Sequence, residues 1–291
     1  MKKTTRVSSQ EILSLKRFIV VAGAVLLSMQ VTYADVIYRE TFSNTAGAPN
    51  TNFDFVGWSG YWSPTAQPDD GVAIPYNNYG VGSSLGNPSG VTNVNAGPEV
   101  GDTNGFAFTS GFLAASNNIL TYTTEYVVNP SAWNVGSISF YSGNASNNPH
   151  SFLNGNIDGY RIAVQIDGSW YASATNLVQS NVIGSAGAFA TSGQQLVFNW
   201  TTAASAWDTL NFVPGSTLSL GGPVGSALPS DPITAFGLYS DTVTDTNGVG
   251  GLATRRWDTY EIDGTVPEPS SFVLAFIGFG TLLGLRRSRK A

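Results

Sequence analysis

The middle of the chain alternates short runs of β-branched, aromatic and aliphatic residues with clusters of Gly, Asn, Pro and Ser. No segment there keeps the apolar period of an amphipathic helix, and short runs separated by turn residues are typical of β-sandwiches and barrels. The sequence therefore predicts an all-β body. The expected strands cover residues 36–42, 105–112, 119–128, 137–142, 160–166, 195–201, 209–213, 217–220, 235–240 and 255–262.

One hairpin is predicted in detail. Aliphatic residues alternate with polar or small ones along 161–166 (RIAVQI), and residues 169–173 (SWYAS) supply the returning strand. Asp167-Gly168 lies between them, a pair that suits the positive φ values of a two-residue hairpin turn. This pattern predicts an antiparallel pair with its apolar face toward a core and its other face solvated.

The N-terminal segment differs from the body in charge and hydropathy. Five basic side chains precede an uncharged apolar stretch at 18–29 (FIVVAGAVLLSM). Thr32 and Ala34 then place small residues at the two positions that a signal peptidase reads. We expect residues 1–34 to be a helical signal peptide that is cleaved after Ala34. An uncleaved N-terminal anchor is the alternative.

The C-terminal segment has three parts. Pro267-Glu268-Pro269 interrupts any strand or helix, because proline lacks a backbone N–H and fixes φ. An uncharged apolar run follows at 272–285 (FVLAFIGFGTLLGL). As a helix it is about 21 Å long, shorter than the ~30 Å hydrocarbon core of a bilayer unless Ser270 and Ser271 extend it. The segment closes with four cations that are expected to stay cytoplasmic, Arg286, Arg287, Arg289 and Lys290.

This tail resembles the PEP-CTERM sorting signal of Gram-negative envelope proteins. The resemblance implies that an exosortase recognises the motif at 267–269 and that the helix at 270–285 crosses the inner membrane transiently before its removal. It also implies export to the cell surface or extracellular matrix, often alongside exopolysaccharide. A plain C-terminal membrane anchor is the alternative. The expected parts of the chain are a signal peptide at 1–34, a β-sandwich at 35–265 and a sorting signal at 266–291 with its basic tail at 286–291.

The order of segments in the body resembles the lectin-like domains found ahead of PEP-CTERM tails. It has an opening strand at 36–42, the Gly57-Trp58 segment, a central hairpin with Trp170, and a closing strand through Trp257. The resemblance implies a single jelly-roll (concanavalin A-like) antiparallel β-sandwich whose first and last strands lie side by side. It does not by itself imply sugar binding.

The charge of the body excludes several functions. Between residues 35 and 265 the chain holds four arginines and seventeen acidic side chains, a formal charge of −13, with no lysine and no cysteine. Such a body repels phosphate backbones, so nucleic-acid binding is disfavoured. Without cysteine there are no disulfides and no thiolate metal sites, and without lysine the body has no Schiff-base chemistry.

Oxygen-bearing side chains gather in an expected loop at 241–248 (DTVTDTNG). Calcium prefers carboxylate, amide and carbonyl oxygens, so Asp241, Asp245 and Asn247 are candidate ligands of a structural calcium. No other cofactor is expected. The EF-hand spacing is not met, because Val243 stands at its third position. Hairpin turns built on Asp and Asn-Gly are the alternative.

Glycoside hydrolysis is the enzyme class to consider, because it uses two carboxylates at close range. Alternation along the last strand places Glu261 and Asp263 on one face. They resemble the start of the Glu-x-Asp-x-x-Glu strand of a laminarinase-like family, but the second catalytic glutamate is missing. His150, the only histidine, lies in an expected loop. We therefore expect no enzymatic activity.

Trp58, Tyr61 and Trp62 lie in a stretch rich in Gly, Ser and Pro (GWSGYWSP). Apolar ring faces stack on sugars while nearby polar groups bind sugar hydroxyls, so these residues are candidate contacts for an extracellular polysaccharide. The alternative is that the rings cap the ends of the sandwich and belong to its core.

The sequence as a whole favours an exported cell-envelope or extracellular protein. Its expected role is non-enzymatic, as a structural or adhesive component of the surface or exopolysaccharide matrix. A carbohydrate-binding module is the first alternative and a polysaccharide-degrading enzyme the second. Signal peptidase and exosortase are the expected partners during export.

Overall fold

The structure is a computed structural model. It describes residues 34–43, 50–51, 53–62, 67–68, 89–92, 98, 105–112, 118–143, 145–146, 159–179, 189, 191–241 and 252–265. Within these ranges no helix is both long and apolar enough to cross a membrane. The expected signal helix and the expected apolar helix at 270–285 lie outside the described residues.

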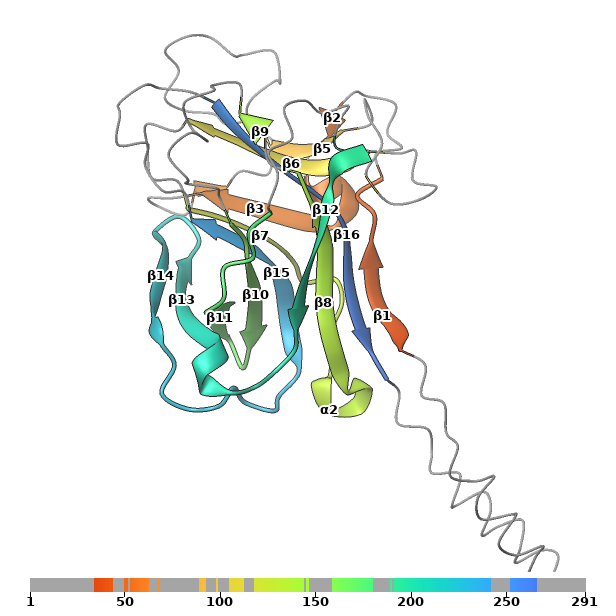
Figure 1. The fold of residues 1–291 in the computed structure, drawn as a ribbon. Helices are drawn as coiled ribbons and strands as arrows, with labels where there is room; N and C mark the ends of the chain where they lie inside the picture. Colours follow the sequence, from red (N-terminus) through yellow and green to blue (C-terminus); the bar gives the residue numbers. More distant parts are fainter. Residues whose placement is uncertain are drawn as a thin grey trace, which may run out of the picture. The chain divides into compact units, whose positions relative to one another are not determined.

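Residues 35–264 form a compact unit of two antiparallel sheets that pack as a sandwich (Figure 1). The all-β prediction is confirmed, and the jelly-roll connectivity stays a prediction. We call the first sheet sheet A, and β1 (Asp35–Glu40) and β9 (Ala145–Ser146) pair with its strand β16. In neighbour order sheet A contains β12 (Gln194–Asn199), β8 (Val135–Ser142), β16 (Leu252–Gly264), β6 (Phe106–Phe112), β5 (Ser89–Thr92) and β2 (Asn50–Thr51).

The second sheet, sheet B, also has eight strands. In neighbour order these are β14 (Thr217–Pro223), β13 (Trp207–Val213), β11 (Ser169–Ser173), β10 (Arg161–Ile166), β15 (Ile233–Asp241), β7 (Asn118–Thr123), β3 (Trp58–Trp62) and β4 (Gln67–Pro68). Three short helices are described beside the sheets, η1 (Phe53–Val56), α2 (Pro130–Trp133) and η2 (Ala204–Ala206).

Strands β10 and β11 form the predicted hairpin. Ile166 pairs with Ser169 across a two-residue turn. The turn residues Asp167 and Gly168 have φ values of 50° and 73°. This left-handed conformation costs glycine little and is tolerated by aspartate. The Asp-Gly sequence therefore fixes the register of the hairpin.

The core lies between the inner faces of the two sheets. On β10, Ile162, Val164 and Ile166 are all 0% exposed, as the alternation predicts. From sheet A, Phe140 and Tyr260 pack against this layer and stack with their ring centroids 6.5 Å apart. Aromatic rings thus fill much of the space that aliphatic side chains fill in other sandwiches.

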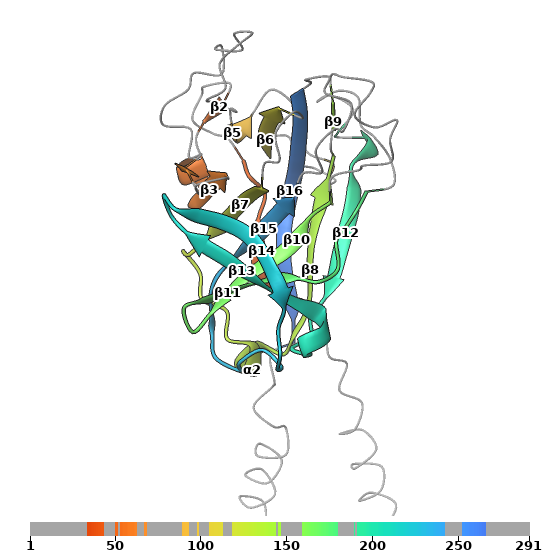
Figure 2. The same ribbon diagram turned by 90° about the vertical axis from the view of Figure 1, so that its left-hand side faces the viewer.

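The outer face of the β10–β11 hairpin is not solvated, which corrects the expectation from its pattern. Ala163 and Ala172 are 0% exposed and Trp170 is 9% exposed, within a second apolar cluster on this face. Sheet B curls, so that β14 approaches β7 and the Asn118 side-chain amide donates to the Leu218 carbonyl over 3.3 Å. Figure 2 shows the β13–β14 hairpin lying across the sheet.

The first and last strands of the body lie side by side, as predicted (Figure 1). β1 and β16 are antiparallel, with Asp35 opposite Gly264 and Glu40 opposite Tyr260. The two ends of the β-sandwich therefore leave it at the same place.

Candidate functional site

Four aromatic side chains gather on the outer face of sheet B. They are Tyr61 from β3, Tyr122 from β7, Trp170 from β11 and Phe212 from β13, and we call them the aromatic face. Tyr61, Tyr122 and Phe212 are half-buried, whereas Trp170 is nearly covered. The curl of sheet B brings these four strands around one apolar cluster.

The four rings hold one another in fixed orientations. Tyr61 and Tyr122 are stacked, with centroids 6.0 Å apart and planes 18° from parallel. Phe212 meets the Tyr61 ring edge-on at 4.9 Å and the Trp170 ring at 5.6 Å. Tyr122 meets Trp170 at 5.0 Å. Edge-to-face and offset pairs of this kind are the favoured aromatic arrangements, so the surface is preorganised.

The tyrosine hydroxyls of the aromatic face are linked. Burial, with smaller contributions from the charge and hydrogen bond of the nearby Tyr61 hydroxyl, raises the pKa of Tyr122 to about 12. The Tyr122 side chain therefore carries a neutral hydroxyl across the physiological pH range. A neutral phenol can donate and accept hydrogen bonds at the edge of an apolar ring surface.

Polar groups lie beside the apolar cluster on the same sheet. Gln165 is on β10, and its Oε1 accepts a hydrogen bond from the exposed Thr234 hydroxyl at 3.1 Å. The Gln165 side-chain amide donates to the Gly168 carbonyl at 3.4 Å. Amide and hydroxyl groups near aromatic rings provide the hydrogen bonds that orient a polar ligand.

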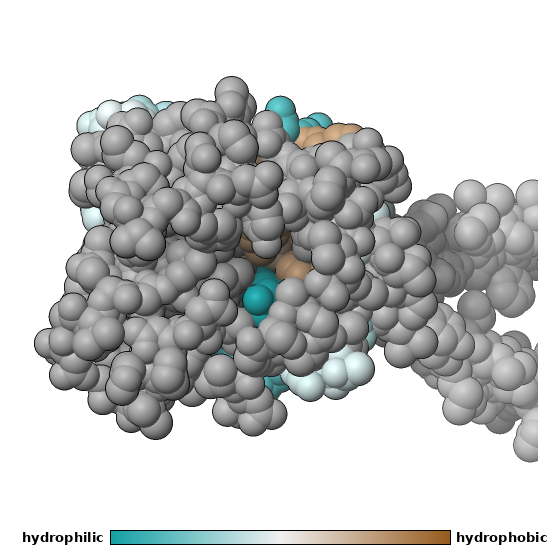
Figure 3. Space-filling view, turned by 90° about the horizontal axis from the view of Figure 1, so that it is seen from above, coloured by the Kyte–Doolittle hydropathy of each residue, from teal (hydrophilic) through white to brown (hydrophobic). Residues whose placement is uncertain are grey.

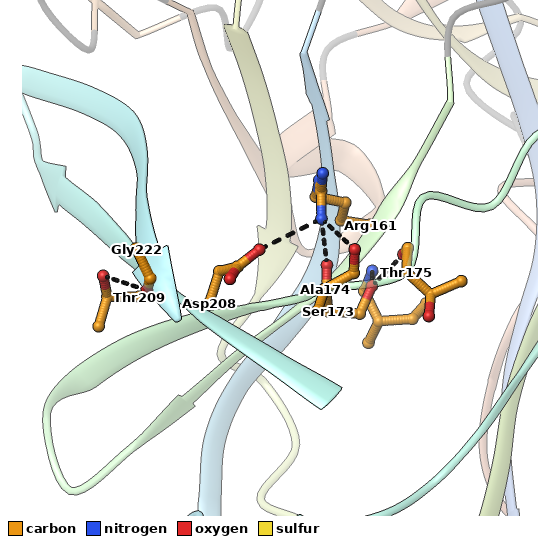
Figure 4. Close-up of polar contacts among 8 residues, drawn as sticks. Arg161, Ser173, Ala174, Thr175, Asp208, Thr209 and Gly222 are labelled. Atoms are coloured by element: carbon orange, nitrogen blue, oxygen red, sulfur yellow. Dashed lines mark hydrogen bonds and ion pairs between the residues drawn. The ribbon is translucent and has the colours of Figure 1, made fainter. Parts of the chain in front are cut away.

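Arg161 holds strands together next to this surface (Figure 4). Its guanidinium donates to the carbonyls of Ser173 and Ala174, both at 2.7 Å, and forms an ion pair with Asp208 at 3.4 Å. The side chains of Arg161 and Asp208 are each 14% exposed. These contacts tie the end of β11 to β10 and β13.

The three aromatic residues selected from the sequence lie in different surroundings. Trp58 is 1% exposed in the core, where its ring meets Phe42 at 4.9 Å and its Nε1–H donates to the Tyr38 hydroxyl. The Trp58 ring is therefore no part of a surface platform. Tyr61 belongs to the aromatic face. The Trp62 side chain lies outside the described residues.

Sequence reasoning missed the other three members of the aromatic face. Tyr122, Trp170 and Phe212 come from strands far apart in the sequence. The sequence did contain one indication that this face is covered: the large apolar residue Trp170 stands at an outward-facing position of its strand, opposite Gln165. Such a residue indicates that the outer face is covered.

The candidate calcium ligands are only partly described. Asp241 is the last residue of β15, with its side chain outside the described residues, and Asp245 and Asn247 lie wholly outside them. Among the described residues no group of three acidic or histidine side chains is close enough to hold a metal ion. Calcium binding at 241–248 stays a prediction.

Glu261 and Asp263 lie on one face of β16, and their side chains form a hydrogen bond with each other. Burial first, and then the charge and hydrogen bond of Asp263, raise the pKa of Glu261. Arg39 on β1 contacts Glu261 at 3.6 Å, and the Ser137 hydroxyl donates to Asp263 at 3.4 Å. These contacts link β1, β16 and β8.

The loop end of the molecule presents a mixed surface. Seen from above, hydrophobic and hydrophilic described residues reach the surface close together (Figure 3). Toward the other end of the strands, Ala34 is exposed and directly precedes β1. The sorting motif residues Pro267, Glu268 and Pro269 and the cations at 286–290 lie outside the described residues.

Comparison with known proteins supports the interpretation of the tail. The family model for the PEP-CTERM protein-sorting motif matches residues 265–290. No curated protein matches the chain. Among solved structures, the family 11 carbohydrate-binding module of the cellulosomal cellulase Lic26A-Cel5E of Clostridium thermocellum is similar, with 11% identity and a TM-score of 0.38 over 81% of this chain and 99% of that chain. The C-terminal segment therefore carries a PEP-CTERM sorting motif.

Proposed function

We propose that this chain is an exported β-sandwich protein of a Gram-negative envelope, delivered to the cell surface or extracellular matrix by its C-terminal tail. The match of the PEP-CTERM motif to residues 265–290, directly after the last strand of the sandwich, carries the proposal. An exosortase recognises Pro267, Glu268 and Pro269, and the cations at 286–290 hold the tail in the cytoplasm until it is removed.

The composition of the body supports this destination. A β-sandwich with seventeen acidic side chains, four arginines and no cysteine depends on no disulfide bond and remains soluble through its charge. Its role is non-enzymatic, as a structural or adhesive component of the surface or exopolysaccharide matrix.

Cell fractionation with a Glu268→Ala variant tests the sorting role. The wild-type protein is released in a form that lacks the tail, whereas Glu268→Ala remains membrane-bound with its tail intact. Ser271→Ala, three residues further along the same segment, is the matched control and is processed as the wild type. Release of Glu268→Ala at the wild-type mass would contradict the proposal.

The aromatic face favours carbohydrate binding as a second candidate function. Tyr61, Tyr122 and Phe212 are half-buried, and their rings are held in fixed orientations. Sugar rings stack on such apolar faces, and the tyrosine hydroxyls with Gln165 provide hydrogen-bonding groups around them.

Titration with the exopolysaccharide of the producing cells tests this second function. Phe212→Ala removes a ring from the aromatic face, and affinity is expected to fall severalfold, up to roughly tenfold, since a stacked ring contributes about 0.5–1.5 kcal/mol. Val213→Ala is the control, because Val213 is the next residue of β13 and is 56% exposed. Equal affinities of wild type and Phe212→Ala would exclude the aromatic face as the binding site.

A further inference from the structure

The sorting motif begins very close to the folded domain. β16 ends at Gly264, and only Thr265 and Val266 separate it from Pro267. An extended chain advances at most about 3.6 Å per residue, so the Cα of Pro267 lies within about 11 Å of the Cα of Gly264. Any enzyme that binds the motif therefore works beside the end of the β-sandwich.

The last two residues of β16 are paired on both sides. Gly264 lies opposite Asp35 of β1 and Val135 of β8. Asp263 lies opposite Val36 and Ser137 in the same two strands. We call the pairing of Asp263 and Gly264 with β1 and β8 the terminal pairing. The terminal pairing takes up both edges of β16 at Asp263 and Gly264. These are the edges that an extended substrate would offer to an enzyme.

Close packing around Gly264, against both backbone and side-chain atoms, holds the terminal pairing closed. Gly264 is buried, and a Cβ placed on it would lie 2.6 Å from the Trp133 carbonyl oxygen and 3.1 Å from that of Asn134, at the end of α2. The side chain of Ile37 packs against the same Cβ position of Gly264. Directly before these residues, Ile262 is 0% exposed in the core. Only glycine fits at position 264, and the strand cannot slide out while Ile262 stays packed.

Proteins commonly bind an extended peptide as an added strand, through main-chain hydrogen bonds to an exposed sheet edge. Here Asp263 and Gly264, which precede the motif by only a few residues, are already paired with β1 and β8. We propose that the folded β-sandwich controls access to the sorting motif, and that the terminal pairing must open before the tail is removed. This inference rests on the proposed sorting function. The rate of tail removal then depends on how easily Asp263 and Gly264 separate from their partners.

An insertion between Thr265 and Val266 tests the inference directly. Five Gly and Ser residues placed there free the motif from the sheet without touching β16. Tail removal is measured by pulse-chase labelling and gel mobility. Its rate is expected to rise roughly threefold or more, because opening a strand end costs a small free energy and the insertion variant does not need that opening. The same peptide inserted between Gly225 and Ser226, both exposed in a turn, is the control and leaves the rate unchanged.

A second variant opens the terminal pairing itself. Gly264→Ala forces a methyl group against the Trp133 carbonyl, so its tail is also expected to be removed faster than the wild-type tail. Circular dichroism of the released protein checks that the sandwich has folded. If the insertion at 265/266 leaves the rate unchanged or lowers it, the inference is wrong whatever Gly264→Ala does.

Adding Glu268→Ala to the insertion variant separates this inference from the sorting function. If Glu268→Ala blocks tail removal but the insertion does not change its rate, only the control by the fold is refuted. If the variant with both the insertion and Glu268→Ala loses its tail at the same rate as the variant with the insertion alone, the sorting function itself is refuted, and this inference with it.

Discussion

At the scale of single residues, Glu40 is a half-buried carboxylate at the end of β1. Its Oε1 accepts a hydrogen bond from the Phe42 backbone N–H at 2.6 Å, which holds Phe42 at a φ of 49° with its ring 0% exposed. Burial, and to a lesser degree the charge of Glu125, raise the pKa of Glu40, while its backbone hydrogen bonds lower it. Burial, with a smaller contribution from the charge of Glu40, raises the pKa of the nearby Tyr38, so the Tyr38 hydroxyl is neutral.

The raised pKa of Glu40 predicts a pH-dependent stability. The folded state binds the proton of the Glu40 carboxyl more tightly than the unfolded state does. Protonated Glu40 therefore contributes to the free energy of unfolding, fully below the ordinary pKa of 4.5, and this contribution is lost as pH rises through the raised pKa. Glu40→Gln keeps the acceptor for Phe42 without the charge. The variant is expected to match the wild type at low pH and exceed it at neutral pH, measured by chemical denaturation. A difference that does not change with pH would contradict this account.

At the scale of elements, β15 and β7 approach each other closely at Gly237. A Cβ placed on Gly237 would lie 2.6 Å from the Tyr122 Cα and closer still to the Thr121 carbonyl oxygen. The Gly237 carbonyl also accepts from the buried Tyr260 hydroxyl at 3.5 Å. Gly237 therefore lets the two strands pack while the aromatic face forms beside them.

Gly237→Ala is expected to lower the free energy of unfolding by about 1–3 kcal/mol, the usual cost of an extra methyl group in a packed interior. The added methyl meets backbone atoms, which cannot rotate away. Gly222→Ala is the control, because nothing lies within 4 Å of a Cβ at Gly222, and its effect should stay within about 0.5 kcal/mol. Urea denaturation measures both, and equal effects would show that the approach of β15 to β7 is not tight.

The elements that depend on local chemistry could be predicted from the sequence. Asp167-Gly168 defined its hairpin because the turn needs two positive φ values. The expected strand at 119–128 is too long, since β7 ends at Thr123 and Val128 instead forms a separate bridge with Ile233. The outward-facing Trp170 was the one local indication that the outer face of sheet B is covered. What covers that face could not be predicted, because no local pattern encodes the contacts between β14 and β7.

At the scale of the whole molecule, the sorting tail was recognisable because its three parts are contiguous in the sequence. The aromatic face was not, because Tyr122, Trp170 and Phe212 meet only after sheet B has curled. Trp58 illustrates the difference. Its Gly/Ser-rich surroundings left both a surface position and a core position open. The structure buries Trp58, and its Nε1–H donates to the Tyr38 hydroxyl at 3.1 Å, so the buried donor is hydrogen-bonded.

The pairing of β1 with β16 brings together the two ends of the β-sandwich at which processing is predicted. The predicted signal cleavage after Ala34 lies next to Asp35, which is opposite Gly264, and the sorting motif follows three residues later. The mature protein is therefore expected to begin at the first residue of β1 and to end shortly after the last residue of β16.

The intact mass of the protein released from cells tests the central claim most directly. We predict a chain that begins at Asp35 and ends within or immediately after Pro267-Glu268-Pro269, without the apolar run and the cations. A released chain that still carries residues 270–291, or a protein that remains in the cytosol with residues 1–34 attached, would contradict the account.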